Sequence, residues 1–319
     1  MRKIAIEEHF RLSKNFSKRS AKAKGRSQYA RVEESVFRKL GDLGEERLKD
    51  MDDAGIDVQV LSLAAPPAST AFAERANDEL YKVTKKYPER FVGLAALALQ
   101  DPDGSATELE RAVKELGFRG AKINTSISKE YIDKKKYWAI FDKAVELEVP
   151  IYLHPSVPEG ELLKPFKDYP HLLGSIWGYG VATGLQVMRL ICGGVFDEYP
   201  ELKIILGHLG EALPFWSWRI DNRWRHEIEL YVSNFKVRKL MKYPSQYITD
   251  NFYMTPSGFF DNAAFMCTYE KVGADRILFA VDYPFESSKK AVQFVEALPI
   301  PEIDKEKIFH LNAEKVFSL

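Results

Sequence analysis

The stretch that decides the fold is MRKIAIEEHF, residues 1–10, in which an apolar strand ends in two carboxylates and an imidazole. Successive side chains of an extended chain face opposite sides. Glu8 is therefore expected on one face, and Ala5, Glu7 and His9 on the other. Two groups that can bind a metal, Glu7 and His9, then leave the end of the first strand in the same direction.

Composition limits the classes of function. The chain has 319 residues, and its 46 lysines and arginines balance its 46 aspartates and glutamates. This balance argues against a general attraction to nucleic acid or to an anionic membrane. The two cysteines, Cys192 and Cys267, lack metal-binding spacing, which is typical of buried thiols in a reducing compartment. Without a signal-peptide segment or a stretch of about 18 apolar residues, we expect a cytoplasmic protein that binds neither nucleic acid nor a membrane.

Apolar runs alternate with amphipathic segments along the chain. The predicted helices include Ala71–Tyr87, Ser105–Leu116, Tyr137–Leu147 and Asn262–Val272. The predicted strands are KIAIE (3–7), VQVLSL (58–63), FVGLAAL (91–97), GAKINT (120–125), PIYLHP (150–155), KIILGH (203–208), NFYMTP (251–256) and RILFAVDYP (276–284). Eight strands alternating with helices favour a parallel α/β fold closed as a (β/α)8 barrel, in one domain over residues 1–319.

A basic segment interrupts this pattern after the first strand. The sequence RLSKNFSKRSAKAKGRSQYAR, Arg11–Arg31, has eight basic residues and no acidic one. It lies in a predicted insertion at about residues 11–40. An arm for nucleic acid is one interpretation. We favour a solvated insertion beside the carboxyl end of the strand, where it could also form part of a lid that attracts anionic substrates.

Polar side chains stand at the carboxyl ends of several predicted strands. They are Glu7, His9, His154, His208 and Asp282. A parallel barrel brings these ends to one rim, where catalytic residues gather. Two imidazoles and two carboxylates suit a borderline divalent cation such as zinc or manganese. Glu7, His9, His154 and Asp282 are the candidate ligands, with His208 close by.

The segment IILGHLGEALPFWSWRIDNRW (204–224) carries a second group of candidates. Glu211 follows His208 by three residues and either orients that imidazole as a general acid–base pair or simply occupies the first turn of a helix. Arg223 is a candidate contact for a substrate carboxylate or phenolate. Arg219, one helical turn earlier, has the alternative of pairing with Asp221.

Two aromatic residues adjoin the candidate ligands. Phe285 follows Asp282 in DYPFE, and Phe10 follows His9. An aromatic ring at the rim can wall a pocket for a flat substrate, and the alternative for Phe285 is plain packing. We assign both as candidate substrate contacts.

The whole set of motifs resembles the decarboxylase branch of the amidohydrolase superfamily, whose members act on 2,6- and 2,3-dihydroxybenzoate and related salicylates. The matching motifs are AIEEHF, LSLAAPP, ALALQDP, YLHP, GVFDEYPELKIILGHLGEALPF, WRIDNR, GADRILFAVDYPFE and NAEKVF. The sharpest is Glu-x-His in the first strand, where most hydrolases of the superfamily carry His-x-His. The resemblance implies a distorted (β/α)8 TIM barrel, one divalent metal ion, and a homodimer or homotetramer. Lys122 is a departure from this resemblance. In some relatives a carboxylated lysine on the fourth strand bridges two metal ions, but Glu-x-His in the first strand argues against that role here.

The resemblance implies a role for each candidate. Glu7, His9, His154 and Asp282 carry over as metal ligands, His208 and Glu211 as the pair beside the substrate, and Arg223 and Phe285 as substrate contacts. The predicted reaction is non-oxidative decarboxylation of a small aromatic acid with an ortho-hydroxyl group. Protonated Asp282 would deliver a proton to the ring carbon before CO2 leaves. The alternatives are a lactone or amide hydrolase on the same barrel, and a catalytically silent binding protein.

Overall fold

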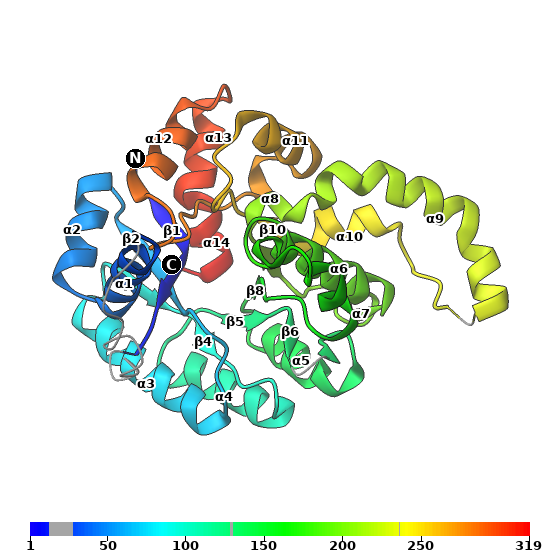
Figure 1. Ribbon diagram of the computed structural model, residues 1–319, viewed down its shortest axis with the longest axis horizontal. Coiled ribbons are helices and arrows are strands. Elements are labelled where there is room, and N and C mark those ends of the chain that lie inside the picture. The colour runs from blue at the N-terminus through cyan, green and yellow to red at the C-terminus, as the bar shows by residue number, and fades with distance from the viewer. Residues whose placement is uncertain (13–27, 128–129, 236) are drawn as a thin grey trace.

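The computed structural model describes residues 1–12, 28–127, 130–235 and 237–319, and in it parallel strands are surrounded by helices (Figure 1). The strands of the central sheets are β1 (Ile4–Phe10), β2 (Val58–Leu63), β3 (Phe91–Gly93), β4 (Ala95–Ala96), β5 (Ala121–Asn124), β8 (Ile151–His154), β9 (Ile204–Leu206) and β10 (Phe252–Met254). β6 (Ser126–Ile127) and β7 (Glu130–Tyr131) form a separate antiparallel pair. Among the described residues, no helix combines the length and the apolar character needed to cross a bilayer.

The strands pair in the order β1-β2-β3 and β10-β9-β8-β5-β4, and every pairing within these two sheets is parallel. β3 and β4 are two pieces of one extended run, separated only by Leu94. The Leu94 amide donates to the Leu61 carbonyl, and the Ala95 amide donates to the Gly120 carbonyl. This one run therefore pairs with β2 of the first sheet through β3 and with β5 of the second sheet through β4. It corresponds to the single strand predicted at 91–97.

The predicted eighth strand, 276–284, is not a regular strand. It makes isolated parallel bridges between Met254 and Ile277 on one side and between Glu8 and Tyr283 on the other. The segment thus touches both β10 and β1 without a continuous ladder. The predicted parallel α/β barrel is confirmed, and it is distorted at this position.

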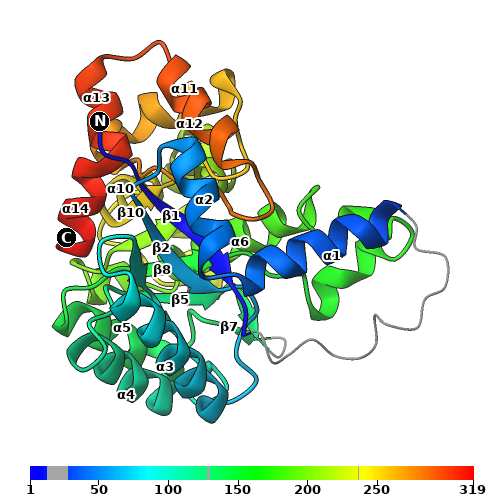
Figure 2. The same cartoon turned by 90° about the vertical axis from the view of Figure 1, so that its left-hand side faces the viewer.

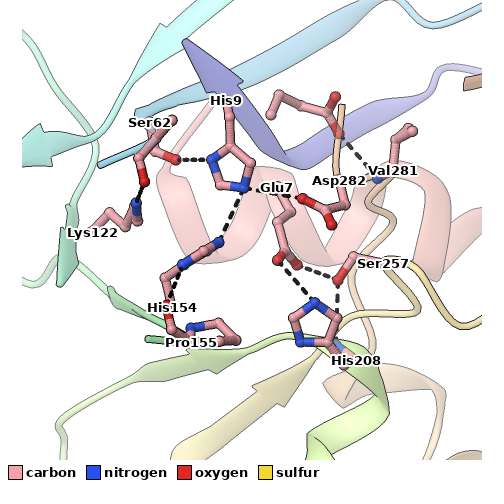
Figure 3. Close-up of polar contacts among 12 residues, drawn as sticks. Glu7, His9, Ser62, Lys122, His154, Pro155, His208, Ser257, Val281 and Asp282 are labelled. Carbon is pink, nitrogen blue, oxygen red and sulfur yellow. Dashed lines mark hydrogen bonds and ion pairs between the residues drawn. The ribbon is translucent and has the colours of Figure 1, made fainter. Parts of the chain in front are cut away.

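β1 departs from simple alternation, because its pairing with β2 shifts in register between Ala5 and Glu8. Ile6 belongs to the cluster inside the barrel, whereas Ala5 belongs to the cluster beneath the helices. Glu7 and His9 point into the barrel opening (Figure 3). The expectation that Ala5 shares their face is wrong, because a bulge reverses the alternation after it.

Fourteen helices are described, and most of them cover the outside of the strands. They are α1 (Gln28–Gly41), α2 (Glu45–Ala54), α3 (Thr70–Lys86), α4 (Pro102–Lys114), α5 (Trp138–Glu146), α6 (Gly178–Cys192), α7 (Val195–Glu198), α8 (His208–Glu211), α9 (Leu213–Phe235), α10 (Pro244–Asn251), α11 (Asn262–Val272), α12 (Ser288–Ala297), α13 (Glu302–Glu306) and α14 (Asn312–Phe317). The four helices named from the sequence correspond to α3, α4, α5 and α11, within three residues at each end. Short 3-10 turns and one π-helical turn, Lys307–Leu311, complete the described elements.

The buried hydrophobic residues form two clusters, one inside the barrel and one between the strands and the surrounding helices. The inner cluster uses early strand residues such as Ile4 and Val58, together with Val316 and Phe317 of α14. The C-terminal helix therefore packs on the interior of the barrel at the amino end of its strands. Polar side chains occupy the carboxyl ends of the strands.

Two helices extend beyond the barrel. α9 projects to one side in Figure 1, and α1 does so in the view of Figure 2. The basic stretch lies mostly at residues 13–27, outside the described residues, and the Arg11 amide at its start donates to the Leu40 carbonyl near the end of α1. That residues 1–319 form a single domain stays a prediction.

Candidate metal centre and active site

Four strand-end side chains converge at the carboxyl rim of the barrel. One ligand atom from each of Glu7, His9, His154 and Asp282 lies within 4.8 Å of all the others. The His9 Nε2 atom is 3.2 Å from His154 Nε2 and 3.1 Å from Asp282 Oδ1 (Figure 3). The sequence predicted this set of four, although its members come from the beginning, the middle and the end of the chain.

Both imidazoles of the group are fixed through their Nδ1 atoms. His154 Nδ1 donates to the Pro155 carbonyl at 2.9 Å, and His9 Nδ1 is 3.1 Å from Ser62 Oγ. Burial, with the positive charge of Lys122, lowers the pKa of His9 to about 3 and the pKa of His154 well below its usual value. Two neutral rings therefore direct their Nε2 atoms at one point, as ligands of a transition metal do.

One carboxylate oxygen of Glu7 accepts hydrogen bonds, and the other accepts none from the described residues. Its Oε2 accepts from Thr255 Oγ1 at 3.1 Å and from Ser257 Oγ. Its Oε1 is buried without a hydrogen-bond partner among the described residues, and His208 Nε2 is 3.6 Å away. A buried carboxylate oxygen with no donor is costly unless a cation satisfies it. The group therefore fits one divalent ion.

Asp282 sits in a strained turn at the end of the irregular eighth segment. Its φ is +76°, a left-handed conformation that aspartate tolerates better than most residues. Its amide donates to the Glu7 carbonyl at 3.0 Å, which ties the turn to β1. Burial raises the pKa of Asp282 to about 7, against the opposing charges of His208 and Lys122. A carboxyl group in this state can hold a proton near neutral pH.

The predicted contact between His208 and Glu211 is present, with His208 Nδ1 2.7 Å from Glu211 Oε1. It does not depend on an ordinary helical first turn. The backbone has positive φ at five successive residues, His208, Leu209, Gly210, Glu211 and Ala212. This left-handed turn folds the carboxylate back onto the imidazole. Although burial lowers the pKa of His208, the Glu7 and Glu211 carboxylates raise it to about 10, so the ring is a cation at neutral pH.

The structure brings one of the three candidate substrate contacts to the rim. The Phe285 ring lies 5.9 Å from the His9 ring and is 54% exposed, so it can line an opening above the centre. Phe10 is buried in the outer cluster, on the side of β1 opposite His9. Arg223 is exposed on α9 and pairs with Glu227 at 3.1 Å. Within this chain Phe10 and Arg223 do not reach the rim, because strand alternation and the projecting helix direct these side chains elsewhere, and their substrate contacts stay a prediction.

Asp221 has a different partner from the one expected. It accepts from the Ser245 amide at 2.9 Å and from Ser245 Oγ at 2.6 Å, where α10 begins, and Arg219 is exposed. Lys122 is buried at the rim and donates to the Leu63 carbonyl at 2.6 Å and to the Ala64 carbonyl at 3.0 Å.

The hydroxyl groups that orient the candidate ligands were missed from the sequence. Ser62 lies opposite His9 in the pairing of β1 with β2. Thr255 and Ser257 lie just after β10, and both hydroxyl groups donate to Glu7 Oε2. A polar residue just after a strand was the available signal, but its partner depends on strand register.

Comparison with known proteins agrees with this geometry. The family model described as amidohydrolase matches residues 42–319. The chain is 38% identical to γ-resorcylate decarboxylase of Polaromonas sp., covering 99% of this chain and 98% of that protein. The structure of dihydroxybenzoic acid decarboxylase from Polaromonas sp., with bound manganese and the inhibitor 2-nitroresorcinol, has a TM-score of 0.88 at 37% identity and covers 100% of this chain and 97% of that one. The structure of 5-carboxyvanillate decarboxylase from Novosphingobium aromaticivorans, with bound manganese and 3-methoxy-4-hydroxy-5-nitrobenzoic acid, has a TM-score of 0.91 at 34% identity, with coverages of 100% and 97%.

Proposed function

We propose, from the premise that this chain belongs to the amidohydrolase family, that it is a metal-dependent decarboxylase of aromatic acids with an ortho-hydroxyl group. The observation that carries the proposal is the convergence of Glu7, His9, His154 and Asp282 at one point of the rim. Relatives similar over nearly the whole chain are decarboxylases of such acids. The reaction needs no oxidant, so the enzyme is a carboxy-lyase.

The four residues would hold one divalent ion, zinc or manganese. Glu7 Oε1, which accepts no hydrogen bond from the described residues, and the Nε2 atoms of the two neutral imidazoles are ligand atoms that suit such an ion. Two solved relatives contain manganese. When bound, the ion supplies Lewis acidity to the carboxylate and ortho oxygen of the substrate and thereby fixes the ring.

Asp282 is the proton donor in this proposal. Direct loss of CO2 would leave an aryl carbanion, which is poorly stabilised. An ortho-phenolate instead pushes electron density to the ring carbon that carries the carboxylate, and protonated Asp282 gives its proton to that carbon. The bond to the carboxylate then breaks, its electron pair restores the aromatic ring, and CO2 leaves. Asp282 regains a proton from water, so one proton is consumed per turnover.

In this proposal His208, oriented by Glu211, interacts with the phenolic oxygen of the substrate. The 2.7 Å contact with Glu211 fixes the His208 ring, and against the effect of burial the Glu7 and Glu211 carboxylates raise the pKa of His208. A cationic imidazole beside the rim stabilises a phenolate and exchanges its proton, an effect worth about 10²–10⁴-fold in rate. Phe285 would wall the flat ring of the substrate.

The substrate class follows from what the relatives share. The γ-resorcylate and 5-carboxyvanillate of their names differ in ring substituents, but each has a hydroxyl next to a carboxylate. We therefore expect this chain to require that pair of groups.

The test is a screen of the manganese- and zinc-loaded enzyme for CO2 and the matching phenol. Salicylate, 2,3- and 2,6-dihydroxybenzoate and 5-carboxyvanillate provide the ortho-hydroxyl group, and 3-hydroxybenzoate is the matched control without it. Turnover of at least one ortho compound and none of the control supports the proposal. Hydrolysis of lactones or amides without any CO2 from the hydroxybenzoates would overturn it in favour of a hydrolase.

We also propose that the chain forms a homodimer or homotetramer through α9. Three aromatic side chains of this projecting helix, Phe215, Trp218 and Phe235, are 69%, 75% and 68% exposed. Exposed apolar side chains gathered on one element mark an interaction surface. Sedimentation should give a mass of two or four chains, and Trp218→Glu should reduce it. Location in the cytoplasm and the absence of nucleic-acid binding stay predictions.

A further inference from the structure

A buried arginine lies behind the candidate metal centre, on the outer side of the barrel. Arg47 belongs to α2 and is fully buried, although no candidate for the reaction is nearby on its own helix. Its Nε donates to the Asp42 carbonyl at 3.0 Å. Burial of a guanidinium costs free energy, so the other contacts of Arg47 should indicate the role of the buried group.

Those contacts join the two segments that carry candidate ligands. One terminal nitrogen of Arg47 donates to the backbone carbonyl of His9. The guanidinium carbon lies 4.4 Å from the centre of the Tyr283 ring, and Tyr283 directly follows Asp282. The His9 amide also donates to the Tyr283 carbonyl at 2.9 Å. Arg47 therefore spans the two chain segments from which His9 and Asp282 reach the same point.

The second carboxylate of the first strand completes this arrangement. Arg47 donates to Gln59 Oε1 at 3.2 Å, and Gln59 Nε2 donates to Glu8 Oε2 at 3.1 Å. Glu8 Oε1 in turn accepts from the Val281 amide at 3.0 Å. The chain of contacts thus returns from the guanidinium, through Gln59 and Glu8, to the residue before Asp282.

We propose that Arg47 is a positioning residue of the metal centre, which sets the separation of His9 and Asp282 by holding their backbones from behind. The inference rests on the proposed four-residue metal site. A guanidinium suits this task because its planar, five-donor group can bond along its edges while its face stacks on an aromatic ring. A lysine at this position keeps the charge but loses the second edge and the flat face.

The test compares Arg47→Lys with a matched control, Arg189→Lys. Arg189 also combines a two-point contact, 2.8 Å to each oxygen of Asp133, with stacking 4.3 Å from the Tyr131 ring. It contacts neither ligand-bearing segment through these groups. Manganese affinity is measured by titration of the metal-free proteins, with the manganese spin-resonance spectrum as a record of coordination geometry.

We expect Arg47→Lys to bind manganese about 10- to 100-fold more weakly than the wild type and to change its spectrum, as loss of an outer contact does in other metal sites. Arg189→Lys should lose thermal stability yet bind manganese within about twofold of the wild type. A lower unfolding temperature alone, with affinity and spectrum unchanged in Arg47→Lys, would overturn the inference and assign Arg47 a structural role.

A second variant keeps the result interpretable if Arg47→Lys does not fold. Tyr283→Leu removes the stacked ring but leaves the guanidinium, and it should weaken manganese binding in the same direction. A wild type that binds no manganese or zinc would overturn the four-residue site itself, together with this inference. A wild type and both variants with equal affinity would overturn only the role of Arg47.

Discussion

The Nε2 atoms of His9 and His154 lie 3.2 Å apart, on two rings that are both held through Nδ1. Burial favours the neutral form of both imidazoles. Their Nε2 atoms converge with Glu7 and Asp282, so a divalent ion bound there would bind the folded state and not the unfolded chain. The stability of the fold should therefore depend on that ion.

Removal of the metal should therefore destabilise the fold. We expect the chelated protein to unfold at a lower temperature, and manganese or zinc to restore it. Free metal at a hundred times its dissociation constant would add about 2.7 kcal/mol. Differential scanning calorimetry with and without chelator measures this. A His310→Gln variant, which changes a histidine between Glu306 and Glu314, should keep the full response, and identical unfolding temperatures in the wild type would contradict the prediction.

Asp282→Asn should fold but lose turnover. The amide keeps the size of the side chain and cannot give a proton to the ring carbon, so we expect a loss of about 10²–10⁴-fold in kcat at saturating manganese. Asp275→Asn, at an exposed aspartate 3.0 Å from Lys307, is the control. Bound manganese is measured in parallel, because Asp282 is also a candidate ligand. A metal-loaded Asp282→Asn variant with more than roughly a tenth of wild-type kcat would refute the donor role.

Much of the site was predictable because its candidate ligands lie at the carboxyl ends of three extended segments, β1, β8 and residues 276–284. An apolar run ending in a histidine or a carboxylate predicts both the strand and the direction of its end, so Glu7, His9, His154 and Asp282 could be assigned together. The contact between His208 and Glu211 was also predictable from spacing. The left-handed turn that makes it was not, because Leu209 and Ala212 are not residues that favour positive φ.

The differences between expectation and structure have a physical cause as well. Alternation along β1 presumes a regular strand, and the register shift before Glu8 has no signal in the sequence. Phe10 was assigned by its closeness to His9 in sequence, although neighbours in a strand face opposite sides. Arg223 was assigned by helical spacing and by the resemblance, neither of which indicates that α9 projects from the barrel. Contacts across strands, such as Ser62 with His9, require the register and therefore the structure.

Gly207→Ala should weaken the metal site although it replaces none of the candidate ligands. A Cβ at residue 207 would lie 2.9 Å from Glu7 Oε2 and 3.1 Å from Glu7 Oε1, closer than ordinary contacts allow. The carboxylate must then move, and we expect about 10-fold or greater loss of manganese affinity. Gly174→Ala is the matched control, since a Cβ there meets no described atom within 4 Å. Equal affinities of the two variants in a manganese titration would show that Glu7 adapts without cost.

Lys122 should leave a pH signature on stability. Burial lowers its pKa to about 7, whereas an unfolded lysine titrates near 10.4. Between these values the unfolded chain binds more protons than the folded one, so the folded state gains stability as pH rises. We expect the metal-free wild type to gain up to about 1.4 kcal/mol per pH unit relative to Lys122→Met from pH 7 to 10, with a constant difference below pH 7. Denaturant titrations at several pH values measure the difference, and Lys289→Met, at an exposed lysine of α12, should show no such slope. A difference that stays flat, or that falls as pH rises, would mean that Lys122 remains charged at the rim and that its ammonium is a fixed part of the site.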